Sequence, residues 1–312
     1  MKRYITIDGG TSTTRVSLLE NKTLIATQKP PVSVGKCKHD KPALVRGIKD
    51  AINDLLTKHK LLESDVCAIL ASGMITSEYG LCELSHLPAP AGIAELHDAM
   101  NSVFIPEISN IPFFFLRGVR LISNSVDDCD MMRGEETELM GLMSETDGAC
   151  VYVLPGSHSK IIRTDKNGRI VDFRTMLTGE MIAALSQNTV LRDAVDLSSE
   201  TYDKQALLDG YRYAAAHGIN EALFKVRVLK VLFSKNAIQT YSFFLGVILC
   251  DEIDYILSSK ASKVVIGGRQ QIKDATAEIL RTVSDAEIVT VSEELVAAST
   301  SLGMIRIFEY KK

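Results

Sequence analysis

Two short apolar runs flank a glycine turn within the first twenty residues, and they constrain this chain more than any other feature. The runs are Tyr4–Ile7 and Val16–Leu19, and the turn between them contains Gly9 and Gly10. Strand-like runs around so short a turn predict a β-hairpin. Because the turn leads into another strand and not into a helix, neither the Walker A nor the Rossmann glycine pattern describes it.

The residues of this turn have chemistry suited to phosphate binding. Gly9 and Gly10 carry no side chain, so their backbone N–H groups can approach an anion closely. Thr11 and Ser12 add hydroxyl donors, and Asp8 supplies a carboxylate suited to a hydrated Mg²⁺ ion. An ordinary glycine hairpin with a polar tip has the same pattern, so the turn by itself leaves both interpretations open.

Size, charge and hydrophobicity limit the class of protein. The chain has 312 residues, 46% of them hydrophobic and 24% charged, which is typical of a soluble globular protein with two domains. A net charge of −4 argues against a nucleic-acid or anionic-membrane surface. Apolar runs are too short for a membrane span, and Asp8 interrupts the first one before it could form a signal-peptide core.

The six cysteines are scattered, without a CxxC pair or a nearby set of histidines. This spacing is typical of reduced thiols in a cytoplasmic protein and does not suit a disulfide framework or a zinc site. We therefore expect a cytoplasmic location and no nucleic-acid or membrane partner.

A second strand end carries candidate substrate contacts. Apolar spacing over residues 41–60 predicts an amphipathic helix, and the continuous run Val66–Ala71 predicts a buried strand. That strand ends in Ser72-Gly73-Met74. Ligands bind at the carboxyl ends of strands in α/β sheets, which favours a functional role, although a plain turn accounts for these residues equally well.

An acidic segment precedes the next predicted helix, which begins near Gly134. The segment contains Asp130, Glu135 and Glu136. Carboxylates in a first helical turn stabilise the macrodipole by roughly 0.3–1 kcal/mol each, so their presence requires no catalytic role. They are also the kind of group that accepts a proton from an attacking hydroxyl.

A second hairpin repeats the N-terminal arrangement in the middle of the chain. The buried strand Val151–Leu154 runs into a turn with Gly156, Ser157, His158 and Lys160, after which two further strands are predicted. This repetition predicts an internal duplication in which each copy supplies one phosphate-binding turn. Thr178, Gly179 and Glu180 then begin a helix.

The last part of the chain supplies a third glycine turn. Residues 198–257 read as mostly helical, and Lys263–Ile266 is a short strand that leads into Gly267-Gly268-Arg269. A glycine pair at the end of a strand lets a flat ring or a ribose lie against the backbone. A last strand over 288–291 and a helix over 295–308 complete the prediction.

Taken together, the three turns resemble the phosphate-1, phosphate-2 and adenosine segments of the actin, sugar-kinase and Hsp70 superfamily. Within it, the chain resembles the 2-dehydro-3-deoxygalactonokinase family over nearly its whole length. The motifs that carry this resemblance are Ile7-Asp8-Gly9-Gly10-Thr11, Met132-Arg133-Gly134-Glu135-Glu136-Thr137, Pro155-Gly156-Ser157-His158-Ser159-Lys160 and Asp172-Phe173-Arg174-Thr175-Met176-Leu177-Thr178-Gly179-Glu180. Relatives often carry Trp at the positions of Gly9 and Ile161, whereas this chain has no Trp, which leaves the exact sugar open.

The resemblance implies an α/β fold with two RNase-H-like, actin-like ATPase domains flanking an ATP and substrate cleft. The expected domains are residues 1–133 on the sugar-acid side and 134–294 on the nucleotide side, with the helix over 295–312 packing back on the first. The implied activity is ATP-dependent phosphorylation of the 6-hydroxyl of a 2-keto-3-deoxy aldonate, with a homodimer as one assembly. A phosphatase acting on polyphosphate or nucleotides, or an actin-like assembly protein, remains the alternative.

The resemblance also implies roles for individual residues. Asp8 would hold Mg²⁺, and one carboxylate of the acidic segment would be the base, with Glu136 first and Glu135 and Asp130 as alternatives. ATP would contact Gly9, Gly10, Thr11, Ser12, Gly156, Ser157, His158, Lys160, Gly267 and Gly268. The sugar acid would contact Ser72, Gly73, Met74, Arg133, Arg174, Thr178 and Glu180.

Overall fold

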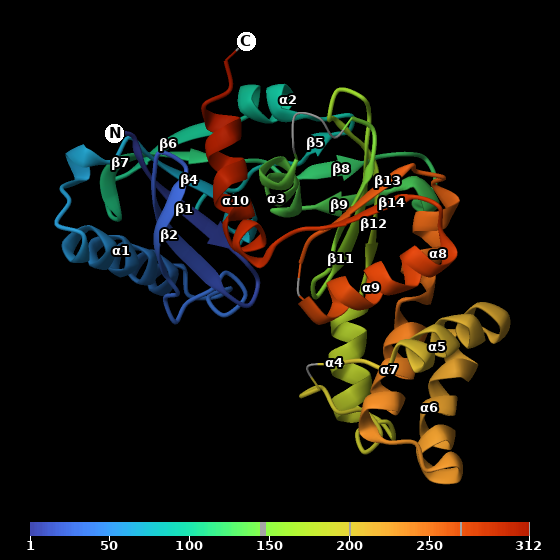
Figure 1. The fold of residues 1–312 in the computed structure, drawn as a ribbon. Coiled ribbons are helices and arrows are strands. Elements are labelled where there is room, and N and C mark those ends of the chain that lie inside the picture. The colour runs from blue at the N-terminus through green and yellow to red at the C-terminus, as the bar shows by residue number, and fades with distance from the viewer. Residues whose placement is uncertain (144–147, 200, 269, 312) are drawn as a thin grey trace. The chain divides into compact units, whose positions relative to one another are not determined.

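The computed structural model describes residues 1–143, 148–199, 201–268 and 270–311, and Figure 1 shows its course. Its internal contacts divide the chain into two units. Unit 1 comprises Met1–Gly148, Asp165–Asp172 and Glu294–Lys312, and unit 2 comprises Ala149–Thr164 and Phe173–Glu293. This division differs from the expected boundary between residues 133 and 134, because the helix that follows Gly134 belongs to unit 1.

Unit 1 is built on a mixed six-stranded sheet with the order β3-β2-β1-β4-β7-β6. Strand β1 pairs antiparallel with β2 and parallel with β4, and β4 pairs parallel with β7. The predicted N-terminal hairpin is therefore confirmed, and its first strand is central in the sheet. The strands are β1 (Arg3–Gly9), β2 (Thr14–Glu20), β3 (Thr23–Gln28), β4 (Ala68–Gly73), β6 (Asn101–Ile105) and β7 (Ser109–Phe115).

The helices of unit 1 bury the faces of this sheet. Helix α1 (Lys41–Lys58) begins at Asp40, whose side chain accepts a hydrogen bond from the Ala43 N–H, and it buries a stripe that includes Leu44 and Ile48. Helix α10 (Glu293–Phe308) is joined to β1 by a 2.7 Å hydrogen bond between the Ser301 and Thr6 hydroxyls. A small sheet adds β5 (Leu87–Pro88), β8 (Val119–Leu121) and β9 (Asp130–Met132), and α2 (Ile93–Asp98) and α3 (Glu135–Leu142) complete the unit.

Helices α3 and α10 cross at a distance that only glycine permits. A Cβ atom on Gly303 of α10 would lie 1.8 Å from the Thr137 carbonyl oxygen, and one on Gly141 of α3 would lie 1.8 Å from the Ser299 carbonyl oxygen. Figure 1 shows the two helices side by side. This crossing fixes the position of α3, whose first turn carries the acidic residues singled out in the sequence.

Unit 2 repeats the strand arrangement of unit 1. Its five-stranded sheet has the order β12-β11-β10-β13-β14, in which β10 pairs antiparallel with β11 and parallel with β13. The same relations hold for β3-β2-β1-β4-β7, so the predicted duplication and the RNase-H-like fold of both units are confirmed. The strands are β10 (Val151–Leu154), β11 (Ser159–Thr164), β12 (Ile170–Met176), β13 (Lys263–Ile266) and β14 (Glu287–Thr290).

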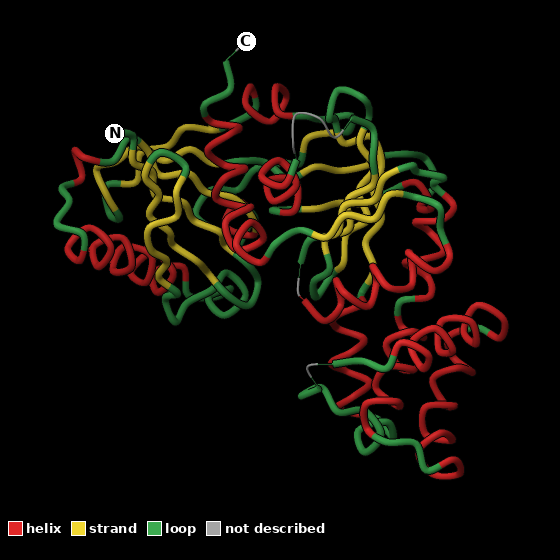
Figure 2. The backbone as a smooth tube through the Cα atoms, in the orientation of Figure 1, coloured by secondary structure: helices red, strands yellow, loops and turns green. Residues whose placement is uncertain are grey.

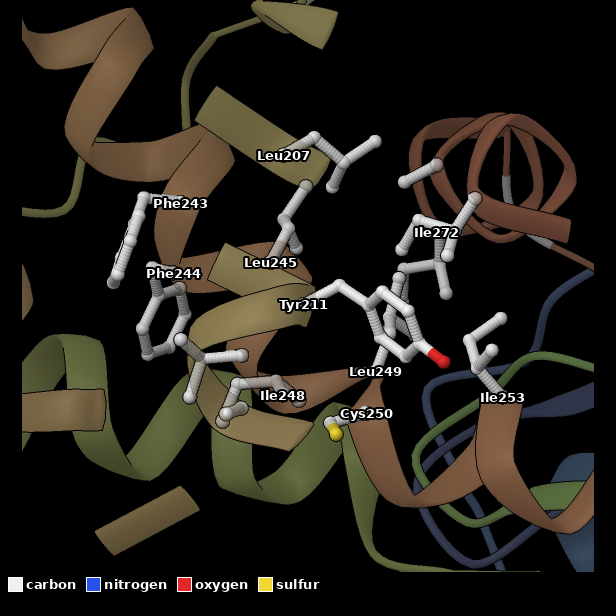
Figure 3. Close-up of a cluster of buried hydrophobic side chains, with 14 of the residues drawn as sticks. Leu207, Tyr211, Phe243, Phe244, Leu245, Ile248, Leu249, Cys250, Ile253 and Ile272 are labelled. Atoms are coloured by element: carbon white, nitrogen blue, oxygen red, sulfur yellow. The ribbon is translucent and has the colours of Figure 1, made fainter. Parts of the chain in front are cut away.

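Helices α8 and α9 lie beside the sheet of unit 2, and α5, α6 and α7 form a group farther from its strands (Figures 1 and 2). The core of unit 2 joins α5, α7 and α8 through side chains such as Leu207, Tyr211 and Phe244 (Figure 3). The predicted helical character of residues 198–257 is confirmed. The helices are α4 (Thr178–Asn188), α5 (Lys204–His217), α6 (Ile219–Phe233), α7 (Ala237–Ile248), α8 (Cys250–Ser258) and α9 (Gln270–Val283).

Within the described parts of the chain, no helix combines the length and the apolar character needed to cross a membrane.

Candidate active site

Hydrogen bonds to backbone carbonyls hold the turn between β1 and β2, and the side chains at its tip remain exposed to solvent. The Gly10 N–H donates to the Thr13 carbonyl (2.9 Å), and the Thr11 carbonyl accepts from the Gly35 N–H (3.0 Å) and the Ser33 hydroxyl (2.9 Å). A Cβ atom on Gly10 would lie 2.7 Å from the Thr13 carbonyl oxygen, so the turn requires glycine there. The hydroxyl side chains at its tip are exposed, namely those of Thr11, Ser12 and Thr13.

Three glycines bring the ends of β1 and β4 against the start of α3. Gly9 and Gly73 are partners in the parallel pairing, and a Cβ atom on Gly73 would lie 2.8 Å from the Gly9 carbonyl oxygen. A Cβ atom on Gly134 would lie 3.2 Å from the Cα of Gly73. Gly73 and Gly134 also adopt positive φ angles of 86° and 114°, which favour glycine. Gly9 and Gly73, both predicted from sequence, therefore lie beside the first turn of α3.

Glu136 is the buried anchor of this helix start. Both of its carboxylate oxygens accept from the Gly134 N–H, at 3.0 and 2.8 Å, and Oε1 also accepts from the Thr137 hydroxyl at 3.0 Å. The Ser72 hydroxyl donates to Thr137 Oγ1 at 3.0 Å, which links the end of β4 to the same carboxylate. The Glu136 side chain is 0% exposed. Burial, followed by the charge of Glu135, raises the pKa of Glu136 to about 7.

A second group of carboxylates lies closer to solvent. Asp8 at the end of β1 forms a 2.8 Å ion pair with Arg15, and Glu135 accepts a 3.0 Å hydrogen bond from the Arg133 N–H. Burial raises the pKa of Asp8, an effect that Arg15 opposes and Glu135 reinforces. Burial and the charges of Glu135 and Asp8 raise the pKa of Glu138 to about 8. Asp8, Glu135 and Glu138 therefore interact as one acidic group.

Sequence analysis missed Glu138 as a member of this group. The signal was present, since Glu138 follows Glu135 by three residues and so lies on the same helix face. Glu138 stands in a run of acidic residues at a helix start. Because the macrodipole already explains such a run, nothing in the sequence singled Glu138 out.

Arg133 is committed to contacts within unit 1. Its guanidinium donates to the Thr76 carbonyl (2.8 Å) and hydroxyl (2.7 Å) and to the Leu84 carbonyl (3.0 Å), and it lies 3.3 Å from His86 Nδ1. Burial, followed by the charge of Arg133, lowers the pKa of His86 to about 4, so the imidazole is neutral near pH 7. Arg133 thus holds the segment after β4 in place, including Met74, which is partly exposed. Asp130 lies apart on β9, where it pairs with Leu121.

The corresponding turn of unit 2 packs against the start of α4. A Cβ atom on Gly179 would lie 2.4 Å from the Gly156 carbonyl oxygen, and the Glu180 N–H donates to the Ser157 carbonyl at 3.2 Å. His158 Nε2 lies 2.9 Å from Glu180 Oε1, with both side chains well exposed. The predicted residues Gly156, Ser157, His158 and Glu180 therefore come together at one end of the unit 2 sheet.

Two predicted contact residues of this region are buried and bonded internally. Lys160 Nζ donates to the Thr175 hydroxyl at 2.5 Å, and its side chain is 4% exposed. The Thr178 hydroxyl donates to Glu252, a buried carboxyl whose pKa is raised by burial. Arg174 lies over the Tyr255 ring, with its guanidinium carbon 5.7 Å from the ring centroid. Glu252 was not foreseen, because nothing in the helix Cys250–Ser258 marks it in the sequence.

The third glycine turn lies beside the second. The Gly267 N–H donates to the Val153 carbonyl at 2.9 Å, and a Cβ atom on Gly268 would lie 2.5 Å from the Pro155 carbonyl oxygen. Gly268 has a positive φ of 75°. These contacts place the backbone after β13 against the turn after β10. Arg269, the third residue of the predicted Gly-Gly-Arg turn, lies outside the described residues.

The residues of unit 1 fit a hydrated Mg²⁺ ion held next to phosphate. Mg²⁺ keeps most of its water and takes one or two carboxylates together with phosphate oxygens. Asp8 offers such a carboxylate at the end of β1, next to a turn with exposed hydroxyls. Among the residues that the structure describes, no group of three or more His, Cys, Asp or Glu side chains is arranged to hold a metal without such help.

Comparisons with known proteins identify the family of this chain. The model of the 2-keto-3-deoxy-galactonokinase family matches residues 8–303. The 2-dehydro-3-deoxygalactonokinase of Escherichia coli (strain K12) is 25% identical over 274 residues, which cover 85% of this chain and 85% of that protein.

Solved structures support the fold. A "putative 2-dehydro-3-deoxygalactonokinase" of Sinorhizobium meliloti matches with a TM-score of 0.76 at 22% identity, over 98% of this chain and all of that one. The activator of the 2-hydroxyisocaproyl-CoA dehydratase from Clostridium difficile, solved with bound ADPNP, matches with a TM-score of 0.53 at 11% identity, over 98% of this chain and 95% of that one. The family match spans all three glycine turns and the acidic helix start, and we conclude that this chain belongs to the 2-keto-3-deoxy-galactonokinase family.

Proposed function

We propose that this protein transfers the γ-phosphoryl group of ATP to the 6-hydroxyl of 2-dehydro-3-deoxy-galactonate or a close 2-keto-3-deoxy aldonate. The observation that carries the proposal is the family match over residues 8–303, which includes the turn at Asp8 and the helix start at Glu135. Phosphoryl transfer requires a positioned phosphate chain, neutralised charge and a group that accepts the proton of the attacking hydroxyl. Each requirement has candidate residues here.

For the nucleotide, we assign phosphate contacts in unit 1 to the backbone of Gly9 and the hydroxyls of Thr11 and Ser12. The Gly10 N–H, which the sequence also suggested, donates to the Thr13 carbonyl and closes the turn instead. The support is a turn closed by its own backbone, with hydroxyls exposed at its tip. When bound, Mg²⁺ would neutralise charge on the transferring phosphoryl group, with Asp8 as its protein ligand. In unit 2 we assign phosphate contacts to Gly156, Ser157 and His158, and the adenosine to the backbone of Gly267 and Gly268.

For the proton acceptor we favour Glu135 over Glu136 and Asp130. Glu136 is 0% exposed and both of its oxygens are used at the start of α3. Glu135 is partly exposed and is coupled by charge to Asp8, the proposed metal ligand. A base must reach the hydroxyl from which it takes the proton, and this requirement favours the more accessible carboxylate.

For the sugar acid, we separate the predicted residues that are bonded inside their own unit from those that keep accessible surface. Ser72, Arg133, Thr178 and buried Lys160 make hydrogen bonds inside their own units, so we assign them positioning roles. Met74, Arg174 and Glu180 keep accessible surface and remain candidates for direct substrate contact, together with the Gly73 backbone.

An assay of ADP release over a panel of sugar acids and plain sugars tests the proposal. We expect rapid ADP release with 2-keto-3-deoxy aldonates, little with plain hexoses, and little with ATP alone. Steady hydrolysis of ATP at the same rate with and without any sugar acid would instead identify a phosphatase and refute the kinase. Mass spectrometry of the product, with 6-deoxy substrate as the control, tests the position of the new phosphate.

A further inference from the structure

A buried carboxyl in unit 2, that of Glu252 on α8, is bonded to the first residue of α4. Glu252 is 1% exposed, and its Oε1 accepts a hydrogen bond from the Thr178 hydroxyl. The other oxygen, Oε2, has no hydrogen-bond partner among the residues that the structure describes. Buried polar atoms without a partner are rare in folded proteins, so this carboxyl indicates a role beyond stability.

The start of α4 packs directly against the turn between β10 and β11. A Cβ atom on Gly179 would lie 2.4 Å from the Gly156 carbonyl oxygen, and the Glu180 N–H donates to the Ser157 carbonyl at 3.2 Å. Gly156 and Ser157 are residues to which we assign phosphate contacts. Thr178 stands one position before these contacts, so a shift of its side chain moves the start of α4 against the turn.

The far end of the same turn also approaches Glu252. Ser159 begins β11 and is 0% exposed, and its Oγ lies 3.5 Å from the Gly156 backbone nitrogen. Burial raises the pKa of Glu252, and the hydroxyls of Thr178 and Ser159 oppose that shift. Glu252 therefore interacts with one residue of α4 and with one residue of the turn that α4 contacts.

Helix α8 is held in unit 2 by contacts other than Glu252. Ile253 and Ile256 pack into the core, and Asp254 accepts a 3.1 Å hydrogen bond from the Tyr211 hydroxyl of α5. Because these contacts already fix α8, it can act as a support from which Glu252 holds the start of α4.

We propose that Glu252 is a positioning residue for ATP: by holding Thr178, it sets the start of α4 against the turn at Gly156 and Ser157 in the geometry that receives phosphate. This inference rests on the proposed function, which assigns phosphate contacts to that turn, and it names the side chain on which the geometry of the turn depends. Because Glu252 is buried, it acts through Thr178 and does not itself touch the nucleotide.

Steady-state kinetics of variants of similar size test this role, with the sugar acid saturating. Glu252→Met removes the acceptor, so we expect the KM for ATP to rise about tenfold or more while kcat changes by less than about threefold. Thr178→Val removes the donor and should have the same effect. In the double variant the two effects should not add, because both substitutions break one bond.

The conservative substitution Glu252→Gln tests the bond to Thr178 separately from the charge. Glutamine keeps an acceptor oxygen and is neutral, as is the protonated form of the carboxyl that burial favours. We therefore expect Glu252→Gln to bring the KM for ATP to within about threefold of the wild type.

The matched control is Tyr211→Phe, which removes a buried hydrogen bond to Asp254 on the same helix. It should leave the KM for ATP unchanged even if it lowers the melting temperature. Wild-type KM in Thr178→Val and in folded Glu252→Met, or an equal rise in Tyr211→Phe, overturns the inference while the proposed function stands. A wild type that transfers no phosphate from ATP to any sugar acid overturns the proposed function, and this inference with it.

Discussion

The carboxylate of Glu136 binds the backbone N–H of Gly134, two residues before it, through both of its oxygens at 3.0 and 2.8 Å. Gly134 has a φ of 114°, which favours glycine, and a Cβ atom on it would lie 3.2 Å from the Cα of Gly73, so this bond fixes the helix start next to the end of β4. Glu136, the residue that sequence analysis placed first as the base, is thus buried and bonded at the helix start. Its neighbour Glu135 is left on the accessible side.

The first prediction compares these two glutamates. We expect Glu135→Gln to lower kcat at least about 100-fold with ATP binding and melting temperature retained, because a positioned carboxylate contributes 10²–10⁴-fold. We expect Glu136→Gln to lower the free energy of unfolding by about 1–3 kcal/mol, because a buried acceptor of three hydrogen bonds is weakened. Steady-state kinetics and chemical denaturation of both variants make the comparison, with Asp130→Asn as the control. If Glu136→Gln loses rate without losing stability, the assignment reverses.

The second prediction concerns the metal ligand. We expect Asp8→Asn to reduce kcat by orders of magnitude and to abolish the dependence of nucleotide affinity on Mg²⁺, because the carboxylate beside the turn is replaced by a weak ligand. The loss of the 2.8 Å pair with Arg15 should cost little stability, since the Arg15 side chain is half exposed. Calorimetric titration of ATP with and without Mg²⁺ measures the effect. Normal turnover in Asp8→Asn would remove Asp8 from the mechanism.

The third prediction tests the turn itself. A Cβ atom on Gly10 would lie 2.7 Å from the Thr13 carbonyl oxygen, so Gly10→Ala must open the turn. We expect it to weaken ATP binding by about tenfold or more, which corresponds to 1.4 kcal/mol. Thr13→Ala serves as the control, because it removes an exposed hydroxyl to which no phosphate contact is assigned and keeps the carbonyl that closes the turn. Wild-type affinity in Gly10→Ala would argue against phosphate binding at this turn.

The fourth prediction separates two roles for His158. Its pair with Glu180 is 2.9 Å long but well exposed, and exposed pairs contribute about 0–1 kcal/mol to stability. If His158 contacts phosphate, His158→Ala should raise the KM for ATP severalfold with an unchanged melting temperature, and Glu180→Gln should do less. Equal and small effects of both substitutions would show that the pair only holds the turn.

Sequence patterns predicted the fold well, because each signal was local. The apolar runs and glycine turns located β1 with β2 and β10 with β11, and these hairpins repeat in two sheets of matching order. The acidic helix start was predicted as well, with α3 beginning at Glu135. The burial of Glu136 beside a partly exposed Glu135 was not predicted, because it depends on Gly73 and Thr137, which are distant or unremarkable in the sequence. The hydrogen bond from Arg133 to the Leu84 carbonyl was not predicted either, because Leu84 is also distant from Arg133 in the sequence.

The last prediction concerns pH and Glu138. The folded protein raises the pKa of this carboxyl from 4.5 to about 8, chiefly by burial and then through the charges of Glu135 and Asp8. The folded state therefore binds more protons than the unfolded state between these two pKa values. The contribution of Glu138 to stability is then fully present below about pH 4.5 and is lost as the pH rises through about 8.

Replacing Glu138 by Gln removes this titration while keeping the size of the side chain. We expect Glu138→Gln to exceed the wild type in free energy of unfolding by at least about 1 kcal/mol at pH 8.5, and by much less at pH 5. Denaturation in urea at both pH values, without divalent cations, measures the difference. Glu107→Gln controls for a general loss of negative charge, because Glu107 is exposed in the segment between β6 and β7. A difference between wild type and Glu138→Gln that stays constant from pH 5 to pH 8.5 would show that Glu138 is not held in this coupled acidic group.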